Sequence, residues 1–222
     1  KVESALAFEC GHTFTPQEDL PIETNHLCIG MYGKDVDFFV LKGSIQKIFS
    51  EIGFDGYEIV PETNNSTFHP GRCATIMYKG QYVGTFGEAH PEVIENYNLT
   101  QRVYLGEIDL DLVYDNSNRT IIYNPLPKYP STSRDIALLV KKDVYVGQIE
   151  AIIEANGQGL VESYKLFDVY TGSQIADGYK SVAYSITYRS KDKTLTDEDV
   201  AKVHDKILSE LESKLDAKLR TN

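Results

Sequence analysis

The sequence predicts an α+β protein built from two domains. Three observations lead to this prediction: helical and strand-like hydrophobic periods follow one another along the chain, a proline-rich segment separates two such series, and charge differs sharply between the two sides. With 41% apolar and 25% charged residues, the 222-residue chain has the composition of an ordinary globular protein. No apolar run is as long as a membrane span requires.

The first part of the chain has the less regular pattern, which still indicates mixed helices and strands. A helix is predicted over residues 38–52, where apolar residues recur at helical spacing up to Gly53. Lys79-Gly80-Gln81 separates two apolar runs and indicates a β-hairpin, and Pro91 stands where a proline starts a helix most readily. Strands are predicted over residues 4–10, 27–32, 74–78, 82–86 and 103–110.

The segment 123–130 is the predicted boundary between the domains. Its prolines at positions 125, 127 and 130 interrupt both helix and sheet pairing, as expected of a linker. We therefore expect one domain over residues 1–123 and a second over residues 124–222. Because the chain begins inside an apolar stretch and without methionine, we also expect it to be an excised fragment of something longer.

The second part of the chain has clear hydrophobic periods of helices and strands. Ile149, Ile152 and Ile153 fall on one helical face, and Thr196 followed by Asp199 is a capping-box arrangement that starts a long helix. Strands are predicted over residues 135–140, 160–170, 179–188 and 217–220, and helices over residues 146–155 and from Thr196 onward. The order β-α-β-β-α-β is that of a ferredoxin-like sandwich.

The acidity of the chain belongs to its first part. Residues 1–125 hold 8 Lys and Arg against 18 Asp and Glu, a net charge of −10, whereas residues 126–222 hold 14 against 15, a net charge of −1. Bulk attraction for phosphate is therefore weak, and any contact with RNA must rely on local geometry.

The first part offers no convincing catalytic or metal site. His69, Glu88 and His90 include metal-ligand types, but they lack the spacing of a helical metal pair, so we interpret both X-Pro segments as turns with histidines that cap or pack. There is no GxxxxGK[ST] or GxGxxG motif, and only Arg72, Arg102 and Arg119 could hold a polyphosphate. The three cysteines are distant from one another and indicate reduced thiols in a cytosolic protein.

The stretch LFDVYTG, residues 166–172, raises a different question. In a strand, Asp168 and Tyr170 point the same way, opposite to Phe167 and Val169, which are then expected in the core. A carboxylate beside an aromatic ring is able to read a nucleobase, but Asp168 is equally suited to brace the following turn, and Tyr170 to pack across strands.

Several motifs together resemble one family. Residues 38–43 (FFVLKG), 68–72 (FHPGR) and 87–93 (GEAHPEV) are similar to the C-terminal half of the phenylalanyl-tRNA synthetase β subunit. The second part resembles its ferredoxin-fold anticodon-binding domain more closely, through SRDIALLV (133–140), LFDVYTG (166–172), GYKSVAYSITYRS (178–190) and KTLTDEDV (193–200) in the same order. The absence of tryptophan and a short run before DFF depart from the family pattern.

The resemblance implies a non-catalytic, class II synthetase-like first domain that packs against the catalytic α subunit in an (αβ)2 assembly. Phenylalanine activation with ATP and Mg2+ would occur on that α subunit, in the cytoplasm, so the fragment itself needs no cofactor and contains no catalytic residue. The editing domain and the N-terminal tRNA-binding module of the family would lie upstream.

For the second domain the resemblance implies contact with the tRNA-Phe anticodon, which starts with guanine. An ionised Asp168 complements the N1–H and N2–H2 donors of guanine, and Tyr170 offers stacking worth about 1–3 kcal/mol. Ser181 adds a hydroxyl if its strand is the neighbour, although it also fits an ordinary solvent-facing position. Arg134 and Lys180 are the expected phosphate contacts, with a salt bridge beside Asp135 as the alternative for Arg134.

Three further interpretations stay open at this point. Lys191 and Lys193 are weaker RNA-binding candidates in a charged loop, where a solvated cluster is the ordinary outcome. The ferredoxin-like domain also suits a regulatory module that binds a small ligand, which requires a pocket with convergent polar groups. A purely structural assembly domain is the third possibility.

Overall fold

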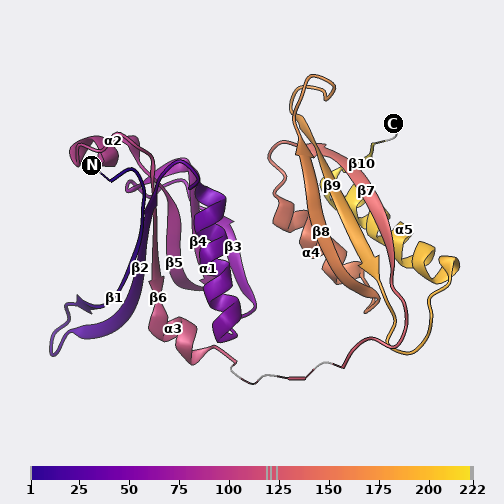
Figure 1. Cartoon of the computed structure of the whole chain (residues 1–222), viewed down its shortest axis with the longest axis horizontal. Coiled ribbons are helices and arrows are strands. Elements are labelled where there is room, and N and C mark those ends of the chain that lie inside the picture. The colour runs from indigo at the N-terminus through magenta and orange to yellow at the C-terminus, as the bar shows by residue number, and fades with distance from the viewer. Residues whose placement is uncertain (1, 119, 121, 124, 221–222) are drawn as a thin grey trace. The chain divides into compact units, whose positions relative to one another are not determined.

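The computed structural model describes residues 2–118, 120, 122–123 and 125–220. It divides into two compact units, an N-terminal unit of residues 1–122 and a C-terminal unit of residues 123–222, each with its own sheet and core (Figure 1). Every strand pairing in both sheets is antiparallel, so the predicted α+β class is confirmed. No helix in the described part of the chain is long and apolar enough to cross a membrane.

The N-terminal unit is a six-stranded sheet in the order β1-β2-β6-β5-β4-β3. Its strands are β1 (Ala5–Thr15), β2 (Ile22–Tyr32), β3 (Tyr57–Pro61), β4 (Phe68–Tyr78), β5 (Gln81–Ala89) and β6 (Val103–Asp109). The predicted hairpin joins β4 to β5 through Lys79 and Gly80, whose φ angles of 49° and 81° suit the tight turns that match strand twist.

Helix α1 (Phe38–Ile52) supplies the main layer against this sheet. It starts at Asp37, whose side chain accepts a hydrogen bond from the Val40 amide, and it ends at Gly53. Gly53 has a φ of 73°, and a Cβ there would stand 1.9 Å from the Asn118 carbonyl oxygen, so glycine is required. The core includes Leu41, Ile45, Phe49, Phe54, Ile76, Val83, Phe86, Ile108 and Val113.

Several details of the N-terminal unit differ from the sequence-based expectation. The segment 68–72 belongs to strand β4, with a register irregularity between Phe68 and Cys73, rather than to a turn. Strand β3 and the short helix α3 (Leu110–Asp115) were not predicted. The capping role of His90 is confirmed, because its ring accepts from the Glu92 amide at the start of α2 (Pro91–Asn96).

The C-terminal unit has the predicted β-α-β-β-α-β order. Its four strands lie in the order β10-β7-β9-β8, and the elements are β7 (Thr132–Lys141), α4 (Val146–Asn156), β8 (Val161–Tyr170), β9 (Tyr179–Tyr188), α5 (Asp197–Leu215) and β10 (Lys218–Leu219). Both helices contribute to one core with alternate strand residues, among them Ile136, Leu138, Val182, Tyr184 and Ile186. The two helices therefore cover one face of the sheet and leave the other open.

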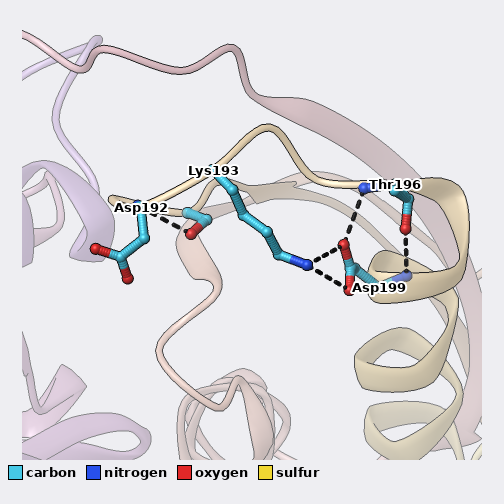
Figure 2. A network of polar contacts seen from close by, with 5 residues as sticks. Asp192, Lys193, Thr196 and Asp199 are labelled. Atoms are coloured by element: carbon cyan, nitrogen blue, oxygen red, sulfur yellow. Dashed lines mark hydrogen bonds and ion pairs between the residues drawn. The ribbon is translucent and has the colours of Figure 1, made fainter.

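The start of α5 is held by a polar network (Figure 2). The Thr196 hydroxyl accepts from the Asp199 amide at 3.2 Å, and the Asp199 carboxylate accepts from the Thr196 amide at 3.1 Å, so the predicted capping box is confirmed. Lys193 Nζ donates to both Asp199 oxygens, at 2.8 and 2.9 Å. Lys193 is therefore committed to this helix terminus, the ordinary outcome considered above for the charged loop.

Candidate functional site

The uncovered face of the C-terminal sheet carries the side chains that the sequence singled out. The core takes one set of alternate residues from β7 and β9, so the other set lies on the opposite side. We call this side the open face and define it by Asp135, Ala137, Leu139, Lys165, Asp168, Tyr170, Ser181, Ala183 and Ser185.

A β-bulge brings Asp168 and Tyr170 to the open face. Leu166 packs against the core, so strict alternation would send Asp168 and Tyr170 toward the core as well. The register shifts between Leu166 and Asp168, after which Asp168 pairs with Ala183 and Tyr170 with Ser181. One extra residue in the strand therefore exchanges the two faces.

The expectation that Phe167 and Val169 belong to the core is wrong. Phe167 is 54% exposed and Val169 is 48% exposed, and the β8 side chains that pack against the core are Val161, Tyr164 and Leu166. The reason is the bulge together with the outer position of β8, which has a neighbouring strand on one side only.

Tyr170 is fitted closely against the turn that follows it. A Cβ at Gly172 would stand 2.1 Å from Tyr170 Oη and 2.3 Å from its Cζ, so only glycine leaves room for the ring. The ring is half-buried, and the guanidinium carbon of Arg220 lies 5.8 Å from its centroid. The glycine that ends LFDVYTG thus helps to set the place of the aromatic ring.

Ser181 is brought to this pair as predicted, but not as an exposed residue. It is the cross-strand partner of Tyr170 and is only 4% exposed. The ordinary solvent-facing position considered for it is therefore wrong. Asp168, Tyr170 and Ser181 form one group on the open face.

Arg134 and Lys180, the two expected phosphate contacts, do not join this group. Each pairs in the β7–β9 ladder with a residue whose side chain packs in the core. Arg134 Nη2 lies 2.7 Å from Asp197 Oδ1, an ion pair with a different acid from the one considered. Lys180 Nζ donates to the Lys142 carbonyl at 3.0 Å, and burial lowers the pKa of Lys180, against the opposing effect of Asp143.

Sequence reasoning missed Arg220 as a member of the site. The predicted last strand contains it, but its side of the sheet depends on how the short β10 pairs with β7. The Arg220 amide donates to the Ala137 carbonyl at 2.8 Å, which continues that pairing by one residue. The pairing of β10 with β7 therefore decides that Arg220 lies on the same face of the sheet as Tyr170.

A polar hollow of about 360 Å³ begins at the residues that follow Tyr170 in the chain. It is formed by the β8–β9 loop and by Lys142, and its lining includes Thr171, Ser173, Asp177 and Tyr179. The hollow adds hydrogen-bonding groups beside Tyr170 on the chain that directly follows β8.

In the N-terminal unit, the described arginines and metal-ligand residues form no comparable exposed polar site. Arg72 Nη1 lies 2.8 Å and Arg102 Nε 3.7 Å from Oε1 of the buried Glu88, so these arginines serve an internal ion-pair cluster, and Arg119 lies outside the described residues. In the part that the structure describes, no three His, Cys, Asp or Glu side chains gather as metal ligands. Burial raises the pKa of the Cys73 thiol to about 11.

The N-terminal unit instead carries an apolar groove of about 500 Å³. We call it the β1–α1 groove; its lining includes Leu6, Phe8, Leu27, Ile29, Met31, Ile48, Ile52 and Leu110. Leu6 and Phe8 are 69% and 76% exposed, which is unusual for large apolar side chains that lie side by side.

Two family models match the chain. The phenylalanyl tRNA synthetase beta chain CLM domain matches residues 1–110, and the ferredoxin-fold anticodon binding domain matches residues 127–220. The second match covers the unit that carries the open face.

Curated relatives match almost the whole chain. A phenylalanine–tRNA ligase beta subunit of Clostridium acetobutylicum is 45% identical over 98% of this chain and 28% of its own length, and one of Streptococcus agalactiae is 37% identical over 99% and 29%. The chain thus spans less than a third of these relatives. A pyrrolysyl tRNA synthetase structure from Desulfitobacterium hafniense covers 51% of this chain and 40% of its own at 14% identity, with a TM-score of 0.42, too low to support an argument.

Proposed function

The chain belongs to the phenylalanyl-tRNA synthetase β-chain family, and we propose that its C-terminal unit binds the anticodon region of tRNA-Phe as part of phenylalanine–tRNA ligase. One observation carries this proposal. Within the residues that match the anticodon-binding model, a carboxylate, an aromatic ring and a hydroxyl stand together on a sheet face that no helix covers.

The chemistry of the open face suits an unpaired guanine. An ionised Asp168 accepts hydrogen bonds from the N1–H and N2–H2 groups, while Tyr170 offers a ring face for stacking. The small side chains of Ala137 and Ala183 leave the sheet surface low beside Asp168, so a flat base has room to approach. A small regulatory ligand would instead use the polar hollow of the β8–β9 loop, whose lining does not include Asp168, Tyr170 or Ser181.

Aminoacylation by the reconstituted α/β enzyme tests the role of Asp168. We expect Asp168→Ala to lower kcat/KM for wild-type tRNA-Phe by about 10–100-fold, because hydrogen bonds to a charged group are worth about 1.5–3 kcal/mol. Transcripts altered at the first anticodon base should lose little, so discrimination between the two kinds of transcript falls.

Asp135→Ala is the matched control, because it removes a carboxylate from the same face at a different row of the sheet, opposite Ser185. Discrimination that survives intact in Asp168→Ala would rule out base reading by this residue.

The N-terminal unit is proposed to serve assembly rather than chemistry. Arg72 and Arg102 are paired with Glu88, and the β1–α1 groove offers apolar surface for the catalytic α subunit in an (αβ)2 enzyme. In this proposal phenylalanine activation with ATP and Mg2+ takes place on that α subunit, in the cytoplasm, and we expect no ATP–pyrophosphate exchange from the isolated chain.

Co-purification with the α subunit tests the assembly role in the full-length β chain. Phe8→Glu places a charge in the groove and should reduce recovery of the complex strongly, since a buried unpaired charge is costly. Phe14→Glu changes another exposed phenylalanine of β1 outside the groove and should leave recovery unchanged. Equal recovery with both variants would show that the α subunit binds elsewhere.

A further inference from the structure

The arginines of the C-terminal unit differ in their partners. Arg134 pairs with Asp197 at 2.7 Å, and Arg189 pairs with Glu162 at 2.8 Å. Arg220 forms no ion pair with any acid in the described part of the chain. It is therefore the arginine of this unit whose charge is still available to an anion.

The side chain of Arg220 is held over the open face by weak contacts. Its guanidinium carbon lies 5.8 Å from the centroid of Tyr170, and its Nη2 lies 3.5 Å from Gln174 Oε1, at the long end of the hydrogen-bond range. A guanidinium has five N–H donors, so most of them are uncommitted. The backbone, by contrast, is fixed to β7 by the bond from the Arg220 amide to the Ala137 carbonyl.

The row of the open face that contains Arg220 is made of small residues as far as Asp168. Across the sheet, Arg220 continues β10 beside Ala137, Ala137 pairs with Ala183, and Ala183 pairs with Asp168. Tyr170 lies on the same face two residues further along β8, opposite Ser181. A nucleotide lying on this row would have the carboxylate at one end and the guanidinium at the other.

We propose that Arg220 binds the phosphate of the nucleotide that stacks on Tyr170; this inference rests on the proposed function. A guanidinium matches the geometry of two phosphate oxygens and stacks on aromatic rings, so the same side chain can leave the ring and bind the phosphate when a base takes its place. Arg220 lies on the same face of the sheet as Tyr170, whereas Arg134 and Lys180 lie on the other face.

A phosphate contact has a signature that base reading lacks. It weakens binding to all sequences alike when it is removed, and it lowers the dependence of binding on salt, by about 0.7 in the slope of log K against log salt for a single strand. Contact with a guanine edge would instead change the affinity only for RNA that carries the guanine.

The experiment measures binding of the 222-residue chain to an RNA hairpin with the tRNA-Phe anticodon loop, and to a second hairpin altered at the first anticodon base, over a range of salt. We expect Arg220→Gln to weaken binding to both hairpins about tenfold at low salt and to lower the salt slope by about 0.7. Arg220→Lys should restore the slope but only part of the affinity, because it keeps the charge and loses the fork.

Two further variants make every outcome decisive. Lys202→Gln removes one positive charge from the exposed surface of α5, on the helix side, and should have little effect. If Tyr170→Ala weakens binding while Arg220→Gln does not, the inference is wrong and the proposed function stands. If Arg220→Gln affects only the guanine-bearing hairpin, Arg220 reads a base and the phosphate contact is wrong. If neither Tyr170→Ala nor Arg220→Gln affects binding, the proposed function and the inference fail together.

Discussion

The β1–α1 groove of the N-terminal unit and the open face of the C-terminal unit expose opposite kinds of chemistry. The groove is lined almost wholly by aliphatic and aromatic side chains, with Leu6 and Phe8 standing in solvent at its edge. The open face presents a carboxylate beside two alanines, a hydroxyl, and an aromatic ring in contact with an arginine.

This difference shows that the fold class of a domain does not determine whether it binds protein or RNA. Both units are antiparallel sheets with helices packed on one side, yet an apolar groove gains most from burial against another protein, whereas an aromatic ring flanked by charges suits an unpaired base. Four predictions follow the comparison between the two units, from the largest effect to the smallest.

The largest expected effect comes from creating a cavity in the hydrophobic core of one unit at a time. Phe49→Ala in the N-terminal unit should cost about 3–5 kcal/mol, and Ile153→Ala in the C-terminal unit about 2–5 kcal/mol, because both side chains are essentially buried. Hydrogen exchange should show lost protection only in the unit that carries the substitution, since no residue belongs to both cores. Equal loss in both units would mean that they unfold as one.

The next effect isolates the open face from the stability of its unit. Gly172→Ala puts a methyl group into the ring of Tyr170 and should weaken binding of the tRNA-Phe anticodon hairpin about tenfold. Gly147→Ala, in α4 where a Cβ meets nothing within 4 Å, is the control and should slightly stabilise the unit. Unchanged RNA binding by Gly172→Ala would show that the ring position is unimportant.

The third prediction compares the helix starts of the two units. Asp37→Ala removes the cap of α1, and Thr196→Ala removes the hydroxyl cap of α5; each should lower the free energy of unfolding of its own unit by about 1 kcal/mol. Urea unfolding followed by a probe in each unit measures both values. A Thr196→Ala variant as stable as the parent would mean that Lys193 and Asp199 hold the helix start without the hydroxyl.

The smallest expected effect is the change in the stability of the C-terminal unit as the pH falls. Hydrogen bonds from Lys193 first, and from Thr196, lower the pKa of Asp199 from its ordinary 3.8 to about 2. Because the folded-state pKa is the lower one, this stabilisation is present above about pH 3.8 and is lost as the pH falls to about 2. Lys193→Ala should therefore be less stable than the parent at pH 6, and the difference should shrink as the pH falls through about 2, in urea unfolding of the C-terminal unit.

The fold of the C-terminal unit could be predicted closely because its periods are local. Ile149, Ile152 and Ile153 mark α4, and Thr196 with Asp199 marks the start of α5, without any knowledge of distant contacts. In the N-terminal unit, β3 was missed because five residues that end in proline carry too little alternation to stand out. The strands β1 and β2 were predicted too short, because their outer ends carry polar residues such as His12 and Asn25, which interrupt the apolar pattern.

The site was harder to predict because it depends on register. Asp168 and Tyr170 share a face by simple alternation, but which face they share is decided by the bulge after Leu166. The side of β7 on which Arg134 lies likewise follows only from the pairing with β9. Arg220 could not be found at all, since a two-residue strand has no periodicity of its own.

The irregular course of β8 also bears on self-association. As an outer strand it offers unpaired backbone groups, and its exposed Phe167 and Val169 would favour strand addition by another molecule. The register shifts at two points along β8, so a second strand would meet a ladder that is out of step with its own. The outer strand β1 has eleven residues in unbroken register and no such protection, so aggregation of the isolated chain is expected to begin there.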